Sequence, residues 1–287
     1  KVLWRRKGFF LRSSGIRQIG LPVLAHEPFA DLGKNKMKIQ VTLTVEEGKR
    51  VIAKGISSLP EVNRVMKEGI ILLKGGTTVS AISEALVGIK LRISGRITGR
   101  GAVTAALKVD GPHSIVIKRG KAETADGHLE EIVSQMGPKD LAICGANIVD
   151  KDGNAAMMAG RFFGGEPGRI LPLLQVEGVP VIVVAGLEKY SPFSLKEALS
   201  ACGRNVSDLS MGMSVGLVPI VGEVFNEIDA IYALGAIQVT VIGRGGICEG
   251  AGSSTFLVEG DSTWANGFME YLCSIKGSLP SGIDDSL

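Results

Sequence analysis

The sequence predicts an α/β protein: a three-layer α/β/α arrangement around a mainly parallel sheet, plus a smaller mixed C-terminal portion. Short runs of branched apolar residues are typical of strands that are buried on both faces, as in parallel sheets. Three such runs stand out, at Ile70–Leu73, Leu141–Cys144 and Val179–Ala185. They alternate with segments whose apolar residues recur at helical spacing. Gly accounts for 39 of 287 residues, close to twice the usual share of about 7%, which predicts many tight turns.

Helices are predicted where apolar residues recur every three or four positions between a capping residue and a breaker. Thr44 can cap the first helix, with Glu46 and Glu47 in its first turn, and Pro60 can open the second. Thr77 or Thr78 can cap a third. The same signals predict later helices over 128–136, 167–174, 194–202, 223–234 and 264–275.

Further short apolar segments predict the remaining strands. They cover 114–118, 215–221, 238–242 and 255–258, although Pro219 weakens the strand that contains it. Residues 92–101 mix strand character with glycines and three arginines. The tail from Gly277 onward is expected to be frayed.

Charge divides the chain unevenly. Residues 1–36 hold eight Lys or Arg and two Asp or Glu, a net charge of +6, so the rest carries −3 within the total of +3. This basic segment is similar to a transit peptide in composition. We interpret it as an upstream or disordered segment before a start at Met37. An α/β ligand-binding domain is expected over 37–210 and a smaller α+β portion over 211–287.

The stretch from Lys74 to Thr78 is the first candidate site. Gly75 and Gly76 allow a sharp turn between a buried strand and a helix, which can leave N–H groups exposed at the positive helix end. Thr77 or Thr78 can cap the helix that follows, and Lys74 adds a charge. Two interpretations stay open here: an anion-binding loop or an ordinary strand-to-helix turn.

A second polar loop follows the strand that ends at Cys144. Open α/β sheets carry their sites where buried strands end, and Asn147 and Asp150 follow that end closely. We expect Asn147 to be functional, with Cys144 or Asp150 handling a proton; a buried thiol needs a lowered pKa for that role. Asp150 can alternatively be a cap, and Asp152 is interpreted as part of a turn.

Two basic residues complete the predicted substrate-binding set. Arg96 lies among the arginines of 92–101, and guanidinium groups suit a bidentate grip on phosphate or carboxylate. Lys189 follows the end of the strand over 179–185. For the arginines, a solvated loop position is an equally open interpretation.

Composition excludes several functions. Aromatic residues are only 5% of the chain and its body is mildly acidic, so no nucleic-acid partner is expected. No apolar run reaches the roughly 18 residues that a membrane span needs. The four cysteines (Cys144, Cys202, Cys248 and Cys273) lack metal-binding spacing and are interpreted as reduced thiols of a cytoplasmic protein. We expect no metal and no cofactor.

Residues 45–190 resemble a superfamily. The order of a strand, a Gly-Thr-Thr loop, a helix and a later strand ending in Gly145-Ala146 is similar to ribose-5-phosphate isomerase, methylthioribose-phosphate isomerase with its initiation-factor relatives, CoA transferases and DeoR-type sugar-phosphate sensors. The resemblance implies that Gly75–Thr78 holds a phosphate or a neighbouring part of the ligand. Where that superfamily has a catalytic or hydroxyl-binding Asp, this chain has Asn147, and Asn cannot act as a carboxylate base. Cys144 likewise replaces an Asp of ribose-5-phosphate isomerase.

We therefore expect a protein that binds a phosphorylated small metabolite similar to a sugar phosphate, and that isomerises it. Asn147 would polarise the carbonyl or bind a hydroxyl. A homo-oligomer is expected. One alternative is a metabolite sensor without chemistry. Another is acyl transfer through Glu249, whose glycine-rich surroundings resemble the nucleophile segment of CoA transferases.

Overall fold

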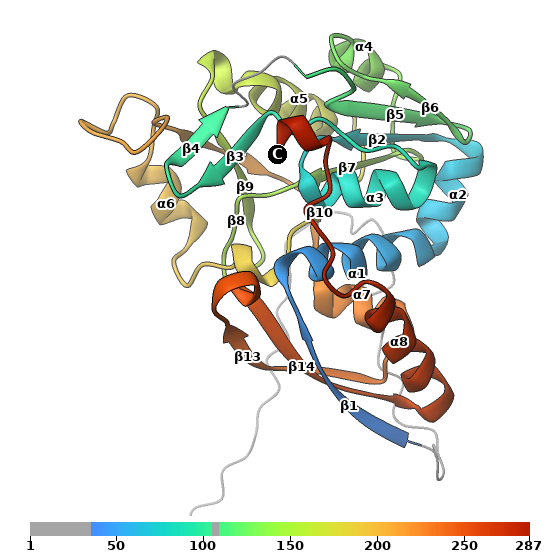
Figure 1. Cartoon of the computed structure of the whole chain (residues 1–287). Helices are drawn as coiled ribbons and strands as arrows, with labels where there is room; N and C mark the ends of the chain where they lie inside the picture. Colours follow the sequence, from blue (N-terminus) through green and yellow to red (C-terminus); the bar gives the residue numbers. More distant parts are fainter. Residues whose placement is uncertain (1–35, 105–108) are drawn as a thin grey trace, which may run out of the picture. The chain divides into compact units, whose positions relative to one another are not determined.

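The largest sheet contains six strands in the order β12-β10-β7-β2-β5-β6 (Figure 1). The structure, a computed structural model, describes residues 36–104 and 109–287. Neighbours from β12 to β2 pair in parallel, whereas β5 is antiparallel to both β2 and β6. The fold is therefore α/β, as predicted, with a mixed sheet. The strands are β2 (Ile70–Lys74), β5 (Ser114–Lys118), β6 (Lys121–Thr124), β7 (Leu141–Gly145), β10 (Val181–Val184) and β12 (Glu223–Phe225).

The central strand β2 confirms the strand expected from its apolar run. Ile71, Leu72 and Leu73 have no exposed surface. Leu72 belongs to a buried apolar cluster with residues of β7, β10, α4 and α5. Because successive strand residues point to opposite faces, Ile71 and Leu73 face the other side of the sheet.

Eight α-helices occur in the described part of the chain. The helix α3 contacts β2 and β7, while α1 packs against α3 and α7. The helices are α1 (Val45–Ser58), α2 (Pro60–Glu68), α3 (Thr77–Val87), α4 (Leu129–Ser134), α5 (Gly165–Val176), α6 (Leu195–Ala201), α7 (Glu227–Ala233) and α8 (Ser262–Ser274).

A second, antiparallel sheet pairs the first described strand with two strands from the C-terminal part of the chain (Figure 1). Its order is β1-β14-β13, with β1 (Lys36–Leu43), β13 (Gln238–Gly245) and β14 (Ser253–Asp261). The sequence analysis missed β1, although Ile39, Val41 and Leu43 alternate with polar residues and are buried. The pairing of β1 with β14 connects the start of the predicted α/β domain to the predicted C-terminal portion. Of the basic segment predicted over 1–36, only Lys36 lies within the described residues.

Two small sheets complete the strand content of the described residues. One is the hairpin of β3 and β4, and the other has the order β11-β9-β8. Their strands are β3 (Gly95–Thr98), β4 (Gly101–Thr104), β8 (Ile148–Val149), β9 (Ala155–Ala159) and β11 (Gly216–Ile220).

The helix predicted over 223–234 is wrong in its first part. Residues Glu223–Phe225 form β12, and α7 begins only at Glu227. The side chain of Asn226 accepts hydrogen bonds from the N–H groups of Ile228 and Asp229, and Asp229 accepts from the N–H of Asn226. This capping box starts the helix at that point and leaves the preceding residues extended.

The prediction of a frayed tail is also wrong. Ser281 and Ser286 are buried, with 1% and 0% of their surface exposed. Ser281 Oγ donates to Ser80 Oγ at 2.8 Å, and the N–H of Ile283 donates to the carbonyl of Leu91 at 2.9 Å. The tail is ordered because its serines and backbone groups form hydrogen bonds with residues far away in the sequence, such as Ser80 and Leu91. The sequence pattern of the tail does not indicate these partners.

Helix α1 begins with the predicted cap. Thr44 Oγ1 accepts from the N–H of Glu47 at 3.3 Å, and Glu47 accepts from the N–H of Thr44 at 3.0 Å. Glu47 also accepts from Lys276 and from the N–H of Gly277. The Glu47 carboxylate of this capping box therefore fixes both the start of α1 and the beginning of the chain segment that follows α8.

Thr44→Ala should lower the free energy of unfolding by about 1 kcal/mol, because it leaves helix N–H groups without their side-chain acceptor. Thr44→Ser keeps the hydroxyl and should lose clearly less. Chemical denaturation of the three proteins checks this. Equal losses in both variants would show that the hydroxyl contributes nothing to stability.

Candidate functional site

The loop after β2 leaves the start of α3 open. Gly76 is the N-cap, with φ 132° and ψ 156°, and no side chain caps the helix. The predicted capping role of Thr77 or Thr78 is therefore wrong: α3 begins at Thr77, so both threonines lie inside its first turn. Glycine is required at position 76 because residues with side chains rarely adopt this φ. The uncapped first turn can offer its N–H groups to an anion.

Lys74 places a buried amine directly before this loop. It is 3% exposed, and its Nζ lies 3.6 Å from Oε2 of Glu166 in the first turn of α5. That distance exceeds a good hydrogen bond, so the amine keeps the capacity to bind another acceptor. Burial lowers the pKa of Lys74, although the neighbouring Glu166 carboxylate opposes this. The predicted charge beside the loop is thus largely removed from water.

His113 packs onto the loop at Gly75. A Cβ at position 75 would lie 2.6 Å from His113 Nε2, so only glycine leaves room for the imidazole. The backbone around His113 is fixed by Asp126, which accepts from the N–H groups of His113 and Ser114 at 2.8 and 2.9 Å. Sequence reasoning missed His113, since a single His before a strand carries no periodic signal.

The contacts of the imidazole determine where its proton lies. Nδ1 is 2.8 Å from the carbonyl oxygen of Arg92, which can only accept, so Nδ1 carries the proton. Nε2 is left with its lone pair, 3.3 Å from Ser94 Oγ and 3.8 Å from Glu166 Oε2. Burial and then the charge of Lys74 lower the pKa of His113. A neutral imidazole whose Nε2 is unprotonated is suited to accept a proton.

Lys74, His113 and Glu166 form one group, named here the Lys74 cluster. A single carboxylate oxygen, Glu166 Oε2, lies near both the amine and the imidazole. Glu166, too, was missed by the sequence analysis. The cluster adjoins the Gly75–Thr78 loop, so the N–H groups at the start of α3 and three titratable side chains meet at the carboxyl end of β2.

Cys144 lies beside Lys74 in the sheet, because the two residues are register partners of β7 and β2. It is fully buried, and burial raises its pKa to about 12. The lowered pKa on which its predicted proton-handling role depends is therefore not found. The thiol stays protonated near neutral pH.

Asp150 and Asn147 have contacts that build the loop itself. Asp150 is 1% exposed and accepts hydrogen bonds from the N–H groups of Asp152, Asn154 and Leu195. Burial raises its pKa, but these bonds and the Asn154 amide outweigh burial and lower it to about 2. Asn147 Oδ1 accepts from the N–H of Met158 at 2.9 Å. The catalytic roles predicted for both residues stay predictions.

The other predicted binding residues are separated. Arg96 donates to the carbonyl of Ser286 at 2.7 Å, in the C-terminal segment. Lys189 lies after β10, where its Nζ is 3.8 Å from Glu188 Oε1. Glu249, the residue of the acyl-transfer alternative, is exposed in a short 3-10 helix between β13 and β14.

A pair of carboxyl groups lies near the ends of β10 and β12. Glu227, 4% exposed, accepts from the N–H of Leu187 at 2.9 Å, and a Cβ at Gly48 would lie 2.6 Å from its Oε1. Arg244 donates to the carbonyl of Leu187. Burial and then the charge of Glu188 raise the pKa of Glu227 to about 7. Sequence reasoning singled out neither Glu188 nor Glu227.

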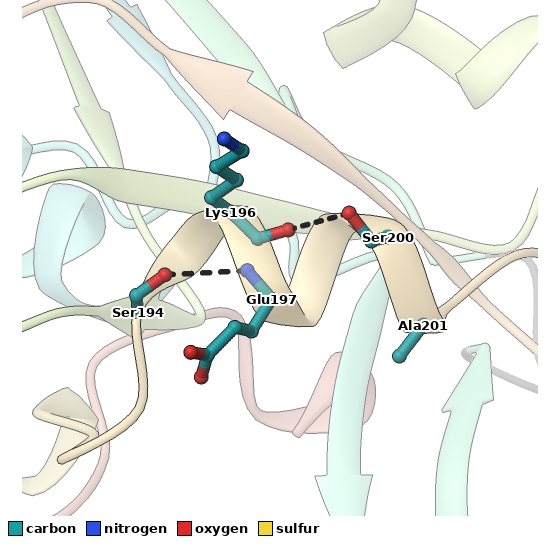
Figure 2. Close-up of a pocket in the computed structure, with 5 residues that line it drawn as sticks. All are labelled: Ser194, Lys196, Glu197, Ser200 and Ala201. Carbon is teal, nitrogen blue, oxygen red and sulfur yellow. Dashed lines mark hydrogen bonds between the residues drawn. The ribbon is translucent and has the colours of Figure 1, made fainter.

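A hollow on the surface of α6 does not have the character of a site. Figure 2 shows the residues that line it, among them Ser194, Lys196 and Ser200. Ser194 Oγ accepts from the N–H of Glu197, and Ser200 Oγ donates to the carbonyl of Lys196. Both hydroxyls serve the helix, so we place the candidate site at the Lys74 cluster.

Comparison with known protein families, with curated proteins and with solved structures finds no match. Among the described residues, each helix is too short or too polar to span a lipid bilayer. The same residues contain no group of three or more His, Cys, Asp or Glu placed to hold a metal ion.

Glu227→Gln should change how stability depends on pH. The folded-state pKa of about 7 lies above the ordinary value of 4.5, so the folded protein binds more protons between these values. The free energy of unfolding should therefore fall by roughly 3 kcal/mol as pH rises through this range, and Glu227→Gln should not show that fall. Urea denaturation at a series of pH values measures it.

Glu249→Gln is the matched control, since it removes an exposed carboxylate and should follow the wild-type profile. If Glu227→Gln also follows the wild-type profile, Glu227 titrates at its ordinary pKa and the electrostatic account of the pair is wrong.

Proposed function

We propose that this protein binds a phosphorylated small metabolite at the Gly75–Thr78 loop and isomerises it. The observation that carries the proposal is the juxtaposition of an uncapped, 11-residue helix with the Lys74 cluster. Helix N-termini bind phosphate through free N–H groups and the helix dipole. Lys74 adds an amine that has unused hydrogen-bonding capacity, which a phosphate oxygen would satisfy.

The imidazole of His113 is our candidate for the proton transfer. Its Nε2 would take a proton from the carbon beside the substrate carbonyl and deliver it to the carbonyl carbon, while the carbonyl oxygen gains a proton and the neighbouring hydroxyl oxygen loses one. Glu166, close to both Nε2 and Lys74, would stabilise the imidazolium between these steps. His113 thus takes the role predicted for Cys144 or Asp150.

The resemblance to sugar-phosphate isomerases, CoA transferases and sugar-phosphate sensors belongs to this proposal. The proposal also includes a three-layer α/β/α arrangement around the six-stranded sheet, a homo-oligomer and a cytoplasmic location. The glycine loop supports the resemblance through its position at the carboxyl end of a central strand, between β5 and β7.

A metabolite sensor without chemistry is the second candidate. The observation that favours it is Asn147 at the position where the resembled superfamily has an acid, with its Oδ1 accepting from the backbone of Met158. An amide cannot act as a carboxylate base. Both candidates share the same phosphate site, so only chemistry separates them.

Thr77→Pro should weaken the binding of ribose 5-phosphate about tenfold or more relative to Thr77→Ala. Proline fits the first helical position but removes the N–H, whereas alanine keeps it. Loss of one hydrogen bond to a charged group is worth about 1.5–3 kcal/mol. Isothermal titration calorimetry with ribose 5-phosphate and with inorganic phosphate measures this, and equal affinities in the two variants would exclude phosphate from the start of α3.

Incubation of the wild-type protein with ribose 5-phosphate in D2O distinguishes isomerase from sensor. Isomerisation through His113 should place deuterium on the carbon beside the carbonyl, detected by NMR, and His113→Gln should abolish the exchange. Binding without exchange would favour the sensor.

A further inference from the structure

The C-terminal residues 281–287, named here the strap, lie along residues 91–96 (Figure 1). The N–H of Ile283 donates to the carbonyl of Leu91 at 2.9 Å, and Ser281 Oγ donates to Ser80 Oγ. Ser80 Oγ in turn accepts from the N–H of Leu91 at 3.0 Å. The strap therefore holds Leu91, the first residue of the 91–96 segment, in two ways. It binds the Leu91 carbonyl directly, and it binds the Leu91 N–H through the Ser80 hydroxyl.

Ser286 makes the central contacts of the strap. Its hydroxyl accepts from the N–H of Ile93 at 2.9 Å and donates to the carbonyl of Ile283 at 2.6 Å. Its own carbonyl accepts from Arg96 at 2.7 Å. With 0% of its surface exposed, Ser286 cannot exchange these partners for water without the strap moving.

Ile93 lies between the two residues that hold the imidazole of His113. The carbonyl of Arg92 accepts from Nδ1, and the hydroxyl of Ser94 lies 3.3 Å from Nε2. A displacement of Ile93 would move both contacts together. Ser286 therefore binds the residue between Arg92 and Ser94, the two residues whose contacts with Nδ1 and Nε2 define the tautomer of His113.

We infer that Ser286 is a positioning residue for His113, and that the strap keeps the proton on Nδ1 and leaves Nε2 unprotonated. This inference rests on the proposed function, in which Nε2 accepts the proton. It gives the C-terminal segment a means of controlling the site, because release of the strap would turn the imidazole away from its reactive arrangement.

Release of the strap should also change the titration of His113. The charged groups around it are Lys74 from β2, Glu166 from α5, Asp126 after β6, and the Arg92 side chain, which pairs with Asp126 at 3.2 Å. Burial and Lys74 hold the pKa of His113 below its ordinary value. Access of water after release would shift that pKa upward.

NMR of the imidazole nitrogens in the ligand-free, full-length chain tests this. The chain has three His, and His113→Gln assigns the signals of His113. In the wild type, His113 should show the Nδ1–H tautomer. In Ser286→Ala, the Nε2–H tautomer should appear and the pKa of His113 should rise.

Ser278→Ala is the matched control, because Ser278 donates to Ile275 within the tail but lies outside the strap. If Ser286→Ala does not fold, Arg96→Gln replaces it in the test. This variant removes the bond to the Ser286 carbonyl, and the tautomer and the pKa of His113 are measured in the same way. Unchanged tautomer and pKa, or equal changes in Ser278→Ala, would overturn the inference. Because no ligand is used, this outcome is independent of whether phosphate binds at Thr77.

Discussion

The burial of the Lys74 amine is the constraint on which the candidate site depends. Lys74 ends a strand whose three preceding residues have no exposed surface, and Lys74 itself is only 3% exposed. A buried charge without a partner is costly. Glu166 supplies the partner from the first turn of α5, where the helix dipole also favours a carboxylate. The pair therefore ties the end of β2 to the beginning of α5.

The register of the sheet brings His113 to the same place. Ser114 pairs with Lys74 across the antiparallel β2 and β5 strands, so His113 lies opposite Gly75. Absence of a side chain at Gly75 lets the imidazole pack onto the loop, and Asp126 holds the backbone that carries it. Gly75 thus serves the turn and also makes room for the imidazole.

Local patterns predicted local structure well. The apolar run at Ile70–Leu73 and the cap at Thr44 depend on residues close in sequence, and both are confirmed. His113 and Glu166 could not be predicted, since their approach to Lys74 depends on strand order and on where α5 starts. The short strand β12 was missed because three residues are too few to show a period. The turn between β2 and α3 was located correctly from its glycines, but the capping residue was not, because Gly76 takes that position.

The hydrogen bonds that a polar group already makes distinguish Asp150 from His113. Asp150 follows a buried strand, as catalytic acids often do, yet its carboxylate accepts from three backbone N–H groups and from an amide. A carboxylate held this way is a weak base, as its lowered pKa of about 2 indicates. His113 has one ring nitrogen fixed by a backbone carbonyl, whereas the other is unprotonated and has one longer contact, with the Ser94 hydroxyl at 3.3 Å. Since a base needs an orienting bond and a free lone pair, the imidazole meets a requirement that Asp150 does not.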